Sequence, residues 1–235
     1  MGVVAALDAE ARILGPAARR ADGLALLRDG TLLAVSGIGG SLAAAAAGSL
    51  ADAGAQCLMS FGLAGGLDPA LIAGAIVLPS EVVSRDGLRF ATAADWREQL
   101  KSAIGRRSIA QRQPVISGTL LSSAAAIDSV ADKAAAFRET GAVAVDMESL
   151  AIARVAAARG LPFIAVRVIV DTAADALPRA VVAASGGGPV NIGRLIAVLA
   201  IAPGEIVALL RLARRYRAAT RSLAAVAAAA VARAA

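Results

Sequence analysis

The sequence contains no histidine, a single cysteine and very few aromatic residues. Without histidine, the chain cannot form a serine–histidine–aspartate triad, a histidine general base or most kinds of zinc site. The single Cys57 excludes an internal disulfide framework and indicates a reducing, cytoplasmic setting. Any chemistry must therefore rest on Asp, Glu, Arg, Ser and backbone groups, and we expect no metal and no cofactor.

Lysine is also scarce, so arginine supplies most of the net charge of +6. A basic chain can attract nucleic acid, but aromatics at 3% leave few platforms for base stacking, and we expect no nucleic-acid partner. The first apolar run has no basic segment before it, which argues against a signal peptide. The most apolar later segment, 191–212, is interrupted by Arg194, Pro203 and Glu205, which argues against a membrane span.

With 235 residues, 58% of them hydrophobic, the chain can build one sizeable core and is short for two. Apolar strand-like runs alternate with helical patterns, beginning with a strand at 2–7 and a helix that opens at Asp8. This alternation predicts one α/β domain over 1–235, with a mostly parallel, mixed central sheet flanked by helices. Basic, apolar helices are expected to close the chain over about 190–235.

Two glycine-rich segments follow predicted strands. The segment 36–40 lies between a strand at 32–35 and an alanine-rich helix at about 41–53, where backbone amides can approach an anion or a ribose. The segment 62–69 contains three glycines and a proline after a strand at 56–61, which predicts a tight loop. Further along, a strand at 114–116 enters the segment 117–122, and a helix is predicted over about 124–140.

The stretch 142–173 contains two strands that each end in a carboxylate. The first strand ends at Asp146, a helix opens on Met147, Glu148 and Ser149, and the second strand stops at Asp171. Ligands bind at the carboxyl edge of an open parallel sheet, where loops and helix N-termini converge. Glu10 also follows a strand end, so three acids are expected to share one site.

Two of the three acids have a structural alternative. Glu148 could be a first-turn carboxylate that interacts with the helix dipole, and Asp171 could cap the segment after its strand. The coincidence of three acids at strand ends favours the shared site. Arg167 lies four strand residues, about 13 Å, from Asp171, so we expect it to be structural and not to pair with that acid.

Taken together, the first strand with Glu10, the glycine segments at 37–40 and 62–66, the block Val-Asp-Met-Glu at 145–148 and the block Arg-Val-Ile-Val-Asp at 167–171 resemble the purine nucleoside phosphorylase and methylthioadenosine nucleosidase superfamily. The resemblance extends from residue 2 to about 173. It implies that Glu148 binds the ribose hydroxyls beside Met147, that Asp171 protonates N7 of the leaving purine, and that Glu10 holds the attacking water. Such roles serve both ends of an N-glycosidic bond as it breaks. The further substrate-binding positions that it implies are Leu63, Gly65, Leu121, Ser122 and Val170.

The sequence departs from the superfamily pattern at three of these positions. Leu63 stands where many members carry a hydroxyl, Leu121 where nucleosidases place an aromatic residue, and Val170 where they often have serine. A more aliphatic pocket is the consequence, in which base recognition depends on Asp171 and on the backbone around Leu121 and Ser122. Glu10 and Leu63 favour water as the acceptor, whereas Arg12 and the Gly39–Gly40 amides leave inorganic phosphate open.

The segments 194–203 and 205–217 resemble the tail of hopanoid-associated phosphorylases, also described as adenosylhopane nucleosidases. This resemblance implies a purine nucleoside with a lipid tail, cleaved to adenine and a ribosyl or phosphoribosyl lipid in hopanoid biosynthesis. The arginines of the tail would suit anionic headgroups at the inner membrane face, or the helices could simply pack on the domain. These arginines are Arg211, Arg214, Arg215, Arg217 and Arg221.

Two other functions remain open from the sequence. One is a methylthioadenosine or adenosylhomocysteine nucleosidase, and the other is a non-catalytic nucleotide- or lipid-binding protein. The superfamily resemblance also implies a homo-oligomer, most simply a homodimer.

Overall fold

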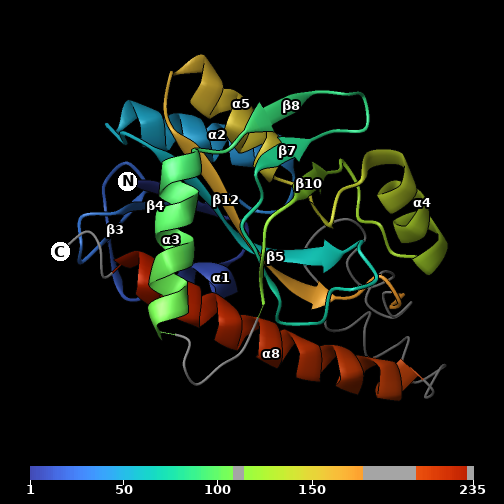
Figure 1. The fold of residues 1–235 in the computed structure, drawn as a ribbon. Coiled ribbons are helices and arrows are strands. Elements are labelled where there is room, and N and C mark those ends of the chain that lie inside the picture. Colours follow the sequence, from blue (N-terminus) through green and yellow to red (C-terminus); the bar gives the residue numbers. More distant parts are fainter. Residues whose placement is uncertain (108–113, 177–204, 232–235) are drawn as a thin grey trace.

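The computed structural model describes residues 1–107, 114–176 and 205–231 (Figure 1). Within them lies a mixed sheet ordered β2-β3-β4-β1-β5-β11-β10-β7-β8, with β12 beside β5, and with β6 and β9 continuing from β12. Its parallel centre consists of β1 (Gly2–Ala5), β4 (Leu32–Val35), β5 (Leu58–Gly66) and β12 (Phe163–Asp171). The other strands are β2 (Ala17–Arg19), β3 (Ala25–Leu27), β6 (Ile76–Val77), β7 (Glu81–Val83), β8 (Arg89–Ala91), β9 (Val115–Ile116), β10 (Thr119–Ser122) and β11 (Ala144–Asp146).

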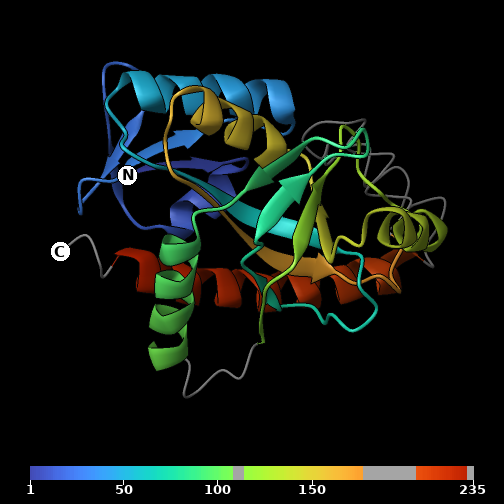
Figure 2. The same ribbon diagram turned by 45° about the horizontal axis from the view of Figure 1, so that its top comes forward.

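Helices cover both faces of the sheet (Figure 2). On one face, α2 (Gly40–Asp52) lies against α5 (Ser149–Ala158), and on the other lie α1 (Asp8–Ile13), α3 (Ala94–Arg107) and α8 (Glu205–Val231). The helix α4 (Val130–Thr140) stands to one side, near β10 and β11. The two main apolar cores fill the spaces between the sheet and these two helix layers. The predicted α/β class, with a mostly parallel mixed sheet and flanking helices, is confirmed.

The strand β5 is longer than predicted. The segment expected to form a loop from Gly62 continues the strand to Gly66, and it pairs with β12 on one side and with β11 on the other. Glycines inside a strand often mark places where another group approaches the backbone closely. Here those groups are the carboxylates of Glu10 and Asp171, which lie against Gly62 and Gly65.

The helix predicted over 124–140 is shorter at its start. Ser129 is its N-cap, with its side-chain oxygen accepting a hydrogen bond from the Asp132 amide at 3.0 Å, and α4 begins only at Val130. The segment 123–129 is therefore a loop that leads away from the end of β10. Its small apolar residues become part of a cavity wall.

Several of the chain's arginines lie on α8, which packs on the domain. The apolar side chains of this helix, including Leu223 and Val226, share a core with Ile164 and Val166 of β12. Arg215 pairs with Asp175 at 2.5 Å. Four other arginines are exposed and form no ion pair within the described residues, namely Arg211, Arg214, Arg217 and Arg221. The predicted helical region at 190–204 lies outside the described residues, and no helix in the described part of the chain is long and apolar enough to cross a bilayer.

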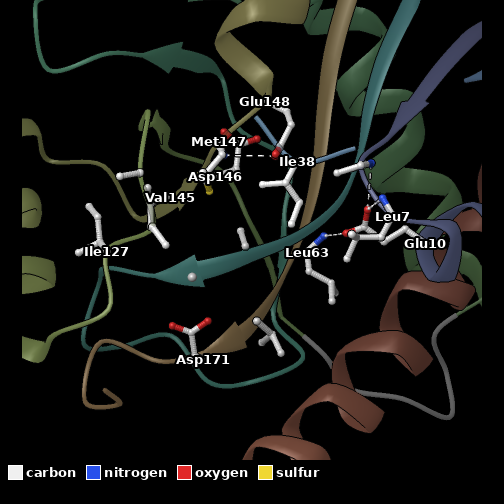
Figure 3. A pocket seen from close by; sticks show the side chains of 16 residues that line it. Leu7, Glu10, Ile38, Leu63, Ile127, Val145, Asp146, Met147, Glu148 and Asp171 are labelled. Carbon is white, nitrogen blue, oxygen red and sulfur yellow. Dashed lines mark hydrogen bonds between the residues drawn. The ribbon is translucent and has the colours of Figure 1, made fainter. Parts of the chain in front are cut away.

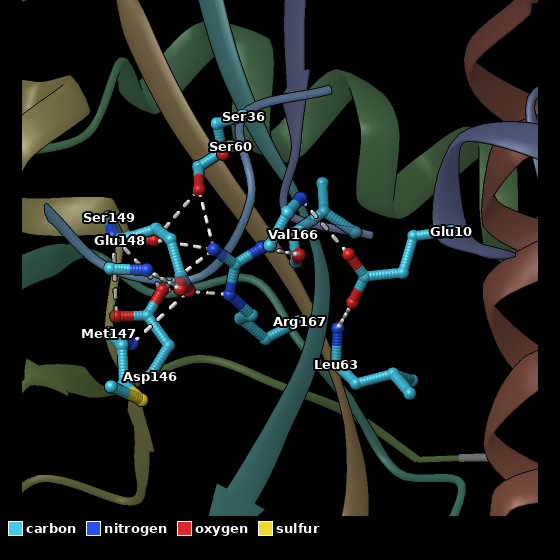
Figure 4. Close-up of polar contacts among 12 residues, drawn as sticks. Glu10, Ser36, Ser60, Leu63, Asp146, Met147, Glu148, Ser149, Val166 and Arg167 are labelled. Atoms are coloured by element: carbon cyan, nitrogen blue, oxygen red, sulfur yellow. Dashed lines mark hydrogen bonds and ion pairs between the residues drawn. The ribbon is translucent and has the colours of Figure 1, made fainter. Parts of the chain in front are cut away.

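A buried ion pair connects several elements at the centre of the sheet (Figure 4). Arg167 of β12 and Asp146 of β11 are 3% and 5% exposed, and their nearest nitrogen–oxygen distance is 2.7 Å. The same guanidinium donates to the hydroxyls of Ser60 at 2.6 Å and Ser149 at 3.0 Å. One side chain thus joins β12 to β5, β11 and α5. The predicted structural role of Arg167 agrees with this arrangement, and its acidic partner is Asp146.

Removing one partner of a buried ion pair leaves the other charged and desolvated, so Asp146→Ala should lower the free energy of unfolding by about 3–5 kcal/mol. The matched control is Asp52→Ala, which breaks the exposed pair between Asp52 and Arg159 at 2.8 Å. That loss should stay below about 1 kcal/mol. Urea unfolding followed by circular dichroism measures both variants, and equal losses would contradict this account of the network.

Candidate active site

A cavity of about 210 Å³ opens at the carboxyl ends of β1, β5, β11 and β12. It brings together the three acids predicted from the sequence, with Asp171 at one end, Glu148 at the other and Glu10 entering from the side (Figure 3). Apart from these acids and Asp146, the wall is apolar or glycine. Its residues are Ala6, Leu7, Glu10, Ile38, Leu63, Ala64, Gly65, Ala125, Ala126, Ile127, Val145, Asp146, Met147, Glu148, Val170 and Asp171.

Within the described residues, only backbone amides donate hydrogen bonds to Glu10. One carboxylate oxygen accepts hydrogen bonds from Ala6 at 3.1 Å and Leu7 at 3.0 Å, and the other accepts one from Leu63 at 2.9 Å. The side chain is 4% exposed, so these bonds fix its position. A cluster of amides of this kind is a natural anion-binding site, and here the chain's own carboxylate fills it.

Glu148 stands at the N-cap position of α5 but does not cap that helix. Its oxygens accept hydrogen bonds from the Gly39 amide at 2.8 Å and the Met147 amide at 3.3 Å, while Asp146 accepts from the Ser149 amide and so takes the capping role. Burial, and then the nearby Asp146 carboxylate, raise the pKa of Glu148 against the opposing effect of Arg167. Glu148 therefore lines the cavity and is not the side-chain cap of α5, and its role in binding stays a prediction.

Asp171 follows an irregularity in β12. The register against β5 shifts between Ile169 and Asp171, and a bulge of this kind redirects the side chain that follows it. The carboxylate lies against Gly65, where an added Cβ would come within 3.3 Å of it. One oxygen pairs with the ammonium of Lys133 from α4. Burial raises the pKa of Asp171, with Lys133 opposing the shift only in part.

The remaining predicted residues divide into two groups. Met147, Leu63, Gly65 and Val170 line the cavity as expected from the sequence. Leu121 does not, because its side chain is fully buried in a core beside α4. Ser122 does not line this cavity but a second, neighbouring one that is described below. The predicted contribution of the backbone around Leu121 and Ser122 to base recognition stays a prediction.

Sequence reasoning missed several residues of the wall and one charged neighbour. Ala125 and Ile127 had no distinguishing signal, because the segment 124–127 was expected to be helical, whereas Ile38 lies in the glycine-rich segment 36–40 that was expected near a ligand. Lys133 did carry a signal, since lysine is rare in this chain. Among the described residues, no group of three potential metal ligands lies together.

A second, larger cavity of about 850 Å³ adjoins the first. The two share Ile38, Ala125 and Met147, and the larger one also includes Gly39, whose amide donates to Glu148. The larger cavity has a mixed wall, with exposed Leu42 and Leu88 as well as charged side chains. Its charged residues are Arg85, Asp86 and Arg154.

Comparison with known proteins assigns the family. The Phosphorylase superfamily model matches residues 26–186, more than half of the chain. The chain therefore belongs to the Phosphorylase superfamily, which confirms the predicted superfamily and the expectation of an enzyme. A search of curated protein sequences found no match.

Solved structures share the fold. A 5'-methylthioadenosine/S-adenosylhomocysteine nucleosidase from Neisseria meningitidis, in complex with methylthio-immucillin-A, has a TM-score of 0.65 and 26% identity, over 73% of this chain and 85% of that one. The corresponding nucleosidase from Colwellia psychrerythraea, in complex with adenine, gives 0.62 and 25%, over 73% and 81%. A futalosine hydrolase from Helicobacter pylori gives 0.62 and 19%, over 73% and 84%.

The position of Glu10 depends on the absence of a side chain at Gly62. A Cβ added there would lie 2.6 Å from a Glu10 oxygen that the Leu63 amide also holds. Gly62→Ala should displace this carboxylate and lower the free energy of unfolding by about 1–3 kcal/mol through overpacking. A crystal structure of the variant and thermal unfolding measure the two effects.

The control for this substitution is Gly48→Ala in the interior of α2, where an added Cβ meets nothing within 4 Å. Alanine there should stabilise the protein by up to about 1 kcal/mol, because glycine is the weaker helix former. An undisplaced Glu10 in Gly62→Ala would contradict the proposed close contact.

Proposed function

We propose that this enzyme cleaves the N-glycosidic bond of a purine nucleoside with water as the acceptor. The observation that carries the proposal is the arrangement of three buried acids around one small apolar cavity, with Glu10 and Glu148 separated from Asp171 along its length (Figure 3). Two carboxylates then face the sugar, and one carboxylic acid faces the base. The raised pKa of Asp171 keeps its proton available nearer to neutral pH than is usual for an aspartate.

The chemistry follows from the charges that develop as the bond breaks. The electron pair of the C1'–N9 bond goes to the purine, and Asp171 delivers its proton to N7, so that the base leaves neutral. Positive charge grows on the ribose, where Glu148 holds the hydroxyls and the carboxylates stabilise it. Glu10 orients a water molecule that attacks C1', and it accepts the proton that this water loses. The products are a purine and a ribose that carries a hydroxyl on C1' and keeps its 5' substituent.

Three features favour water over phosphate. The amides of Ala6, Leu7 and Leu63, which could bind an anion, are already bonded to Glu10. The Gly39 amide is bonded to Glu148, and Arg12 is exposed outside the cavity wall. In the described part of the chain, no arginine or lysine lines the cavity. Inorganic phosphate in this cavity would therefore lie near carboxylates, with no arginine or lysine among the described wall residues to bind it.

For the group on the 5' carbon we propose the hopane skeleton of adenosylhopane. The aliphatic wall formed with Leu63 and Val170, the large cavity that adjoins the Glu148 end, and the resemblance of the C-terminal segments support it. The exposed arginines of α8 would suit an anionic bilayer surface that delivers such a lipid. Peripheral contact with the inner membrane face and a homo-oligomeric state remain predictions within this proposal.

A second candidate is a methylthioadenosine or adenosylhomocysteine nucleosidase. The 26% identity to the Neisseria enzyme favours it, as does the mixed wall of the larger cavity, where Arg85, Asp86 and Arg154 could bind a zwitterionic 5' group. The two candidates differ only in the group beyond the ribose, because both use the same three acids.

Adenine release separates the two candidates. Purified protein is given adenosylhopane in detergent micelles, methylthioadenosine or adenosylhomocysteine, and adenine is measured with the ribosyl product. We expect the highest kcat/KM for adenosylhopane and the same rate with and without inorganic phosphate. Faster cleavage of the soluble nucleosides would favour the second candidate, a phosphate requirement would reject hydrolysis, and no adenine from any substrate would overturn the proposed function.

Asp171→Asn tests the assigned acid. The amide keeps the shape of the side chain but has no proton to give N7, so kcat should fall by about 10²–10⁴-fold while the nucleoside still binds. Isothermal titration with adenine and single-turnover kinetics measure the two properties. Leu26→Ala, a change on the exposed surface of β3, is the control and should leave both unchanged. Full activity of Asp171→Asn would point to another acid, and a wild-type protein that binds without turning over at all would be the non-catalytic alternative.

A further inference from the structure

One of the chain's two lysines is buried beside the general acid. The sequence uses arginine for nearly all of its 24 basic residues, and its lysines are Lys101 and Lys133. Lys101 lies on the surface of α3, whereas the side chain of Lys133 on α4 is 0% exposed. Burying an ammonium group is costly unless every donor finds an acceptor and the charge finds a partner. The surroundings of Lys133 meet both conditions.

The three N–H donors of Lys133 have three acceptors. They are the carboxylate oxygen Oδ2 of Asp171, the Thr172 carbonyl at 2.9 Å and the Asp175 carbonyl at 2.8 Å. An ammonium directs three donors from one nitrogen out of a common plane, whereas the donors of a guanidinium all lie in one plane and are spread over three nitrogens. The chemistry of the acceptors thus explains why lysine stands here in an arginine-rich chain. The contact also fixes Oδ2 of Asp171, so that Oδ1 is the oxygen left to meet a ligand in the cavity.

We propose that Lys133 is a positioning residue for the general acid: it holds Oδ2 of Asp171, so that the proton given to the purine leaves from Oδ1, and it neutralises the carboxylate that remains. This inference rests on the proposed function. The transfer moves one proton from Oδ1 to N7 while the C1'–N9 electron pair passes to the base. The pair then holds one positive and one negative charge, which favours the product side of the step.

The other charges near Asp171 do not replace this effect. Asp175 accepts hydrogen bonds from the amide and the hydroxyl of Thr172, and it pairs with Arg215 of α8 at 2.5 Å. That pair is close to neutral as a unit, so among the residues that the structure describes Lys133 is the cation that faces the acid. Burial raises the pKa of Asp171 and Lys133 lowers it, and hence removal of the lysine should raise that pKa further. The acid would then keep its proton to higher pH but release it to N7 less readily.

The test compares Lys133→Met with Lys101→Met, which removes the exposed lysine of the chain. In Lys133→Met the alkaline limb of the kcat/KM profile should move up by about one pH unit or more, and kcat for the purine nucleoside should fall by about 10²-fold. For 4-nitrophenyl riboside, whose leaving group needs no proton, kcat should fall by less than about threefold, because no proton from Asp171 is required. Lys101→Met should match the wild type in every measurement.

A merely structural role predicts a different result. Equal losses on both substrates, with the alkaline limb unmoved, would overturn the inference. If Lys133→Met does not fold, Lys133→Gln keeps two donors without the charge and should shift the limb in the same direction; an unmoved limb in that variant would overturn the inference as well.

Infrared titration of the Asp171 carboxyl, assigned with Asp171→Asn, gives a readout that needs no turnover. A carboxyl that titrates at higher pH in the lysine variant supports the inference, and an unchanged titration contradicts it. An absence of adenine release by the wild type would instead reject the proposed function alone.

Discussion

The buried ion pair between Arg167 and Asp146 is the interaction on which the site depends. It joins β12 to β11, and through Ser60 and Ser149 it also holds β5 and α5. Because Asp146 is bound to Arg167 and to the Ser149 amide at the start of α5, it cannot act as a free acid. The next carboxylate in the chain, Glu148, is thereby left to face the cavity. Two acids only two residues apart in sequence thus take different tasks, one structural and one in the site.

The same constraint explains the glycines of β5. Carboxylates from α1 and β12 approach this strand so closely that a Cβ at Gly62 would lie 2.6 Å from Glu10, and one at Gly65 would lie 3.3 Å from Asp171. The sequence shows the glycines, and local reasoning interprets them as a loop. Their actual cause is non-local, since it involves side chains about fifty and one hundred residues away. Glycine at these positions allows two carboxylates to lie against the backbone of a regular strand.

The sequence was sufficient where the signal is local or follows a known pattern. It predicted the α/β class, the superfamily, the meeting of Glu10, Glu148 and Asp171 at one sheet edge, and a structural Arg167. It was insufficient where strand pairing or register determines the direction of a side chain. The burial of Leu121 depends on how β10 faces the core, and the direction of Asp171 depends on a bulge that no local pattern announces. The helix α4 starts later than predicted because Ser129 is its N-cap, although the residues before Ser129 have a helical composition.

The three acids differ most in the groups that compensate their charge. Backbone amides surround Glu10, and amides with a nearby ion pair surround Glu148, so neither has a cation of its own among the described residues. Asp171 alone has a full positive charge in direct contact. Fixed dipoles suit groups that begin the reaction as carboxylates, as Glu10 and Glu148 do in the proposed mechanism. A cation is needed where a buried group gains a negative charge, and in that mechanism Asp171 alone does so, because it gives up a proton whereas Glu10 accepts one. The distribution of partners thus agrees with the proposed division between one proton donor and two carboxylates.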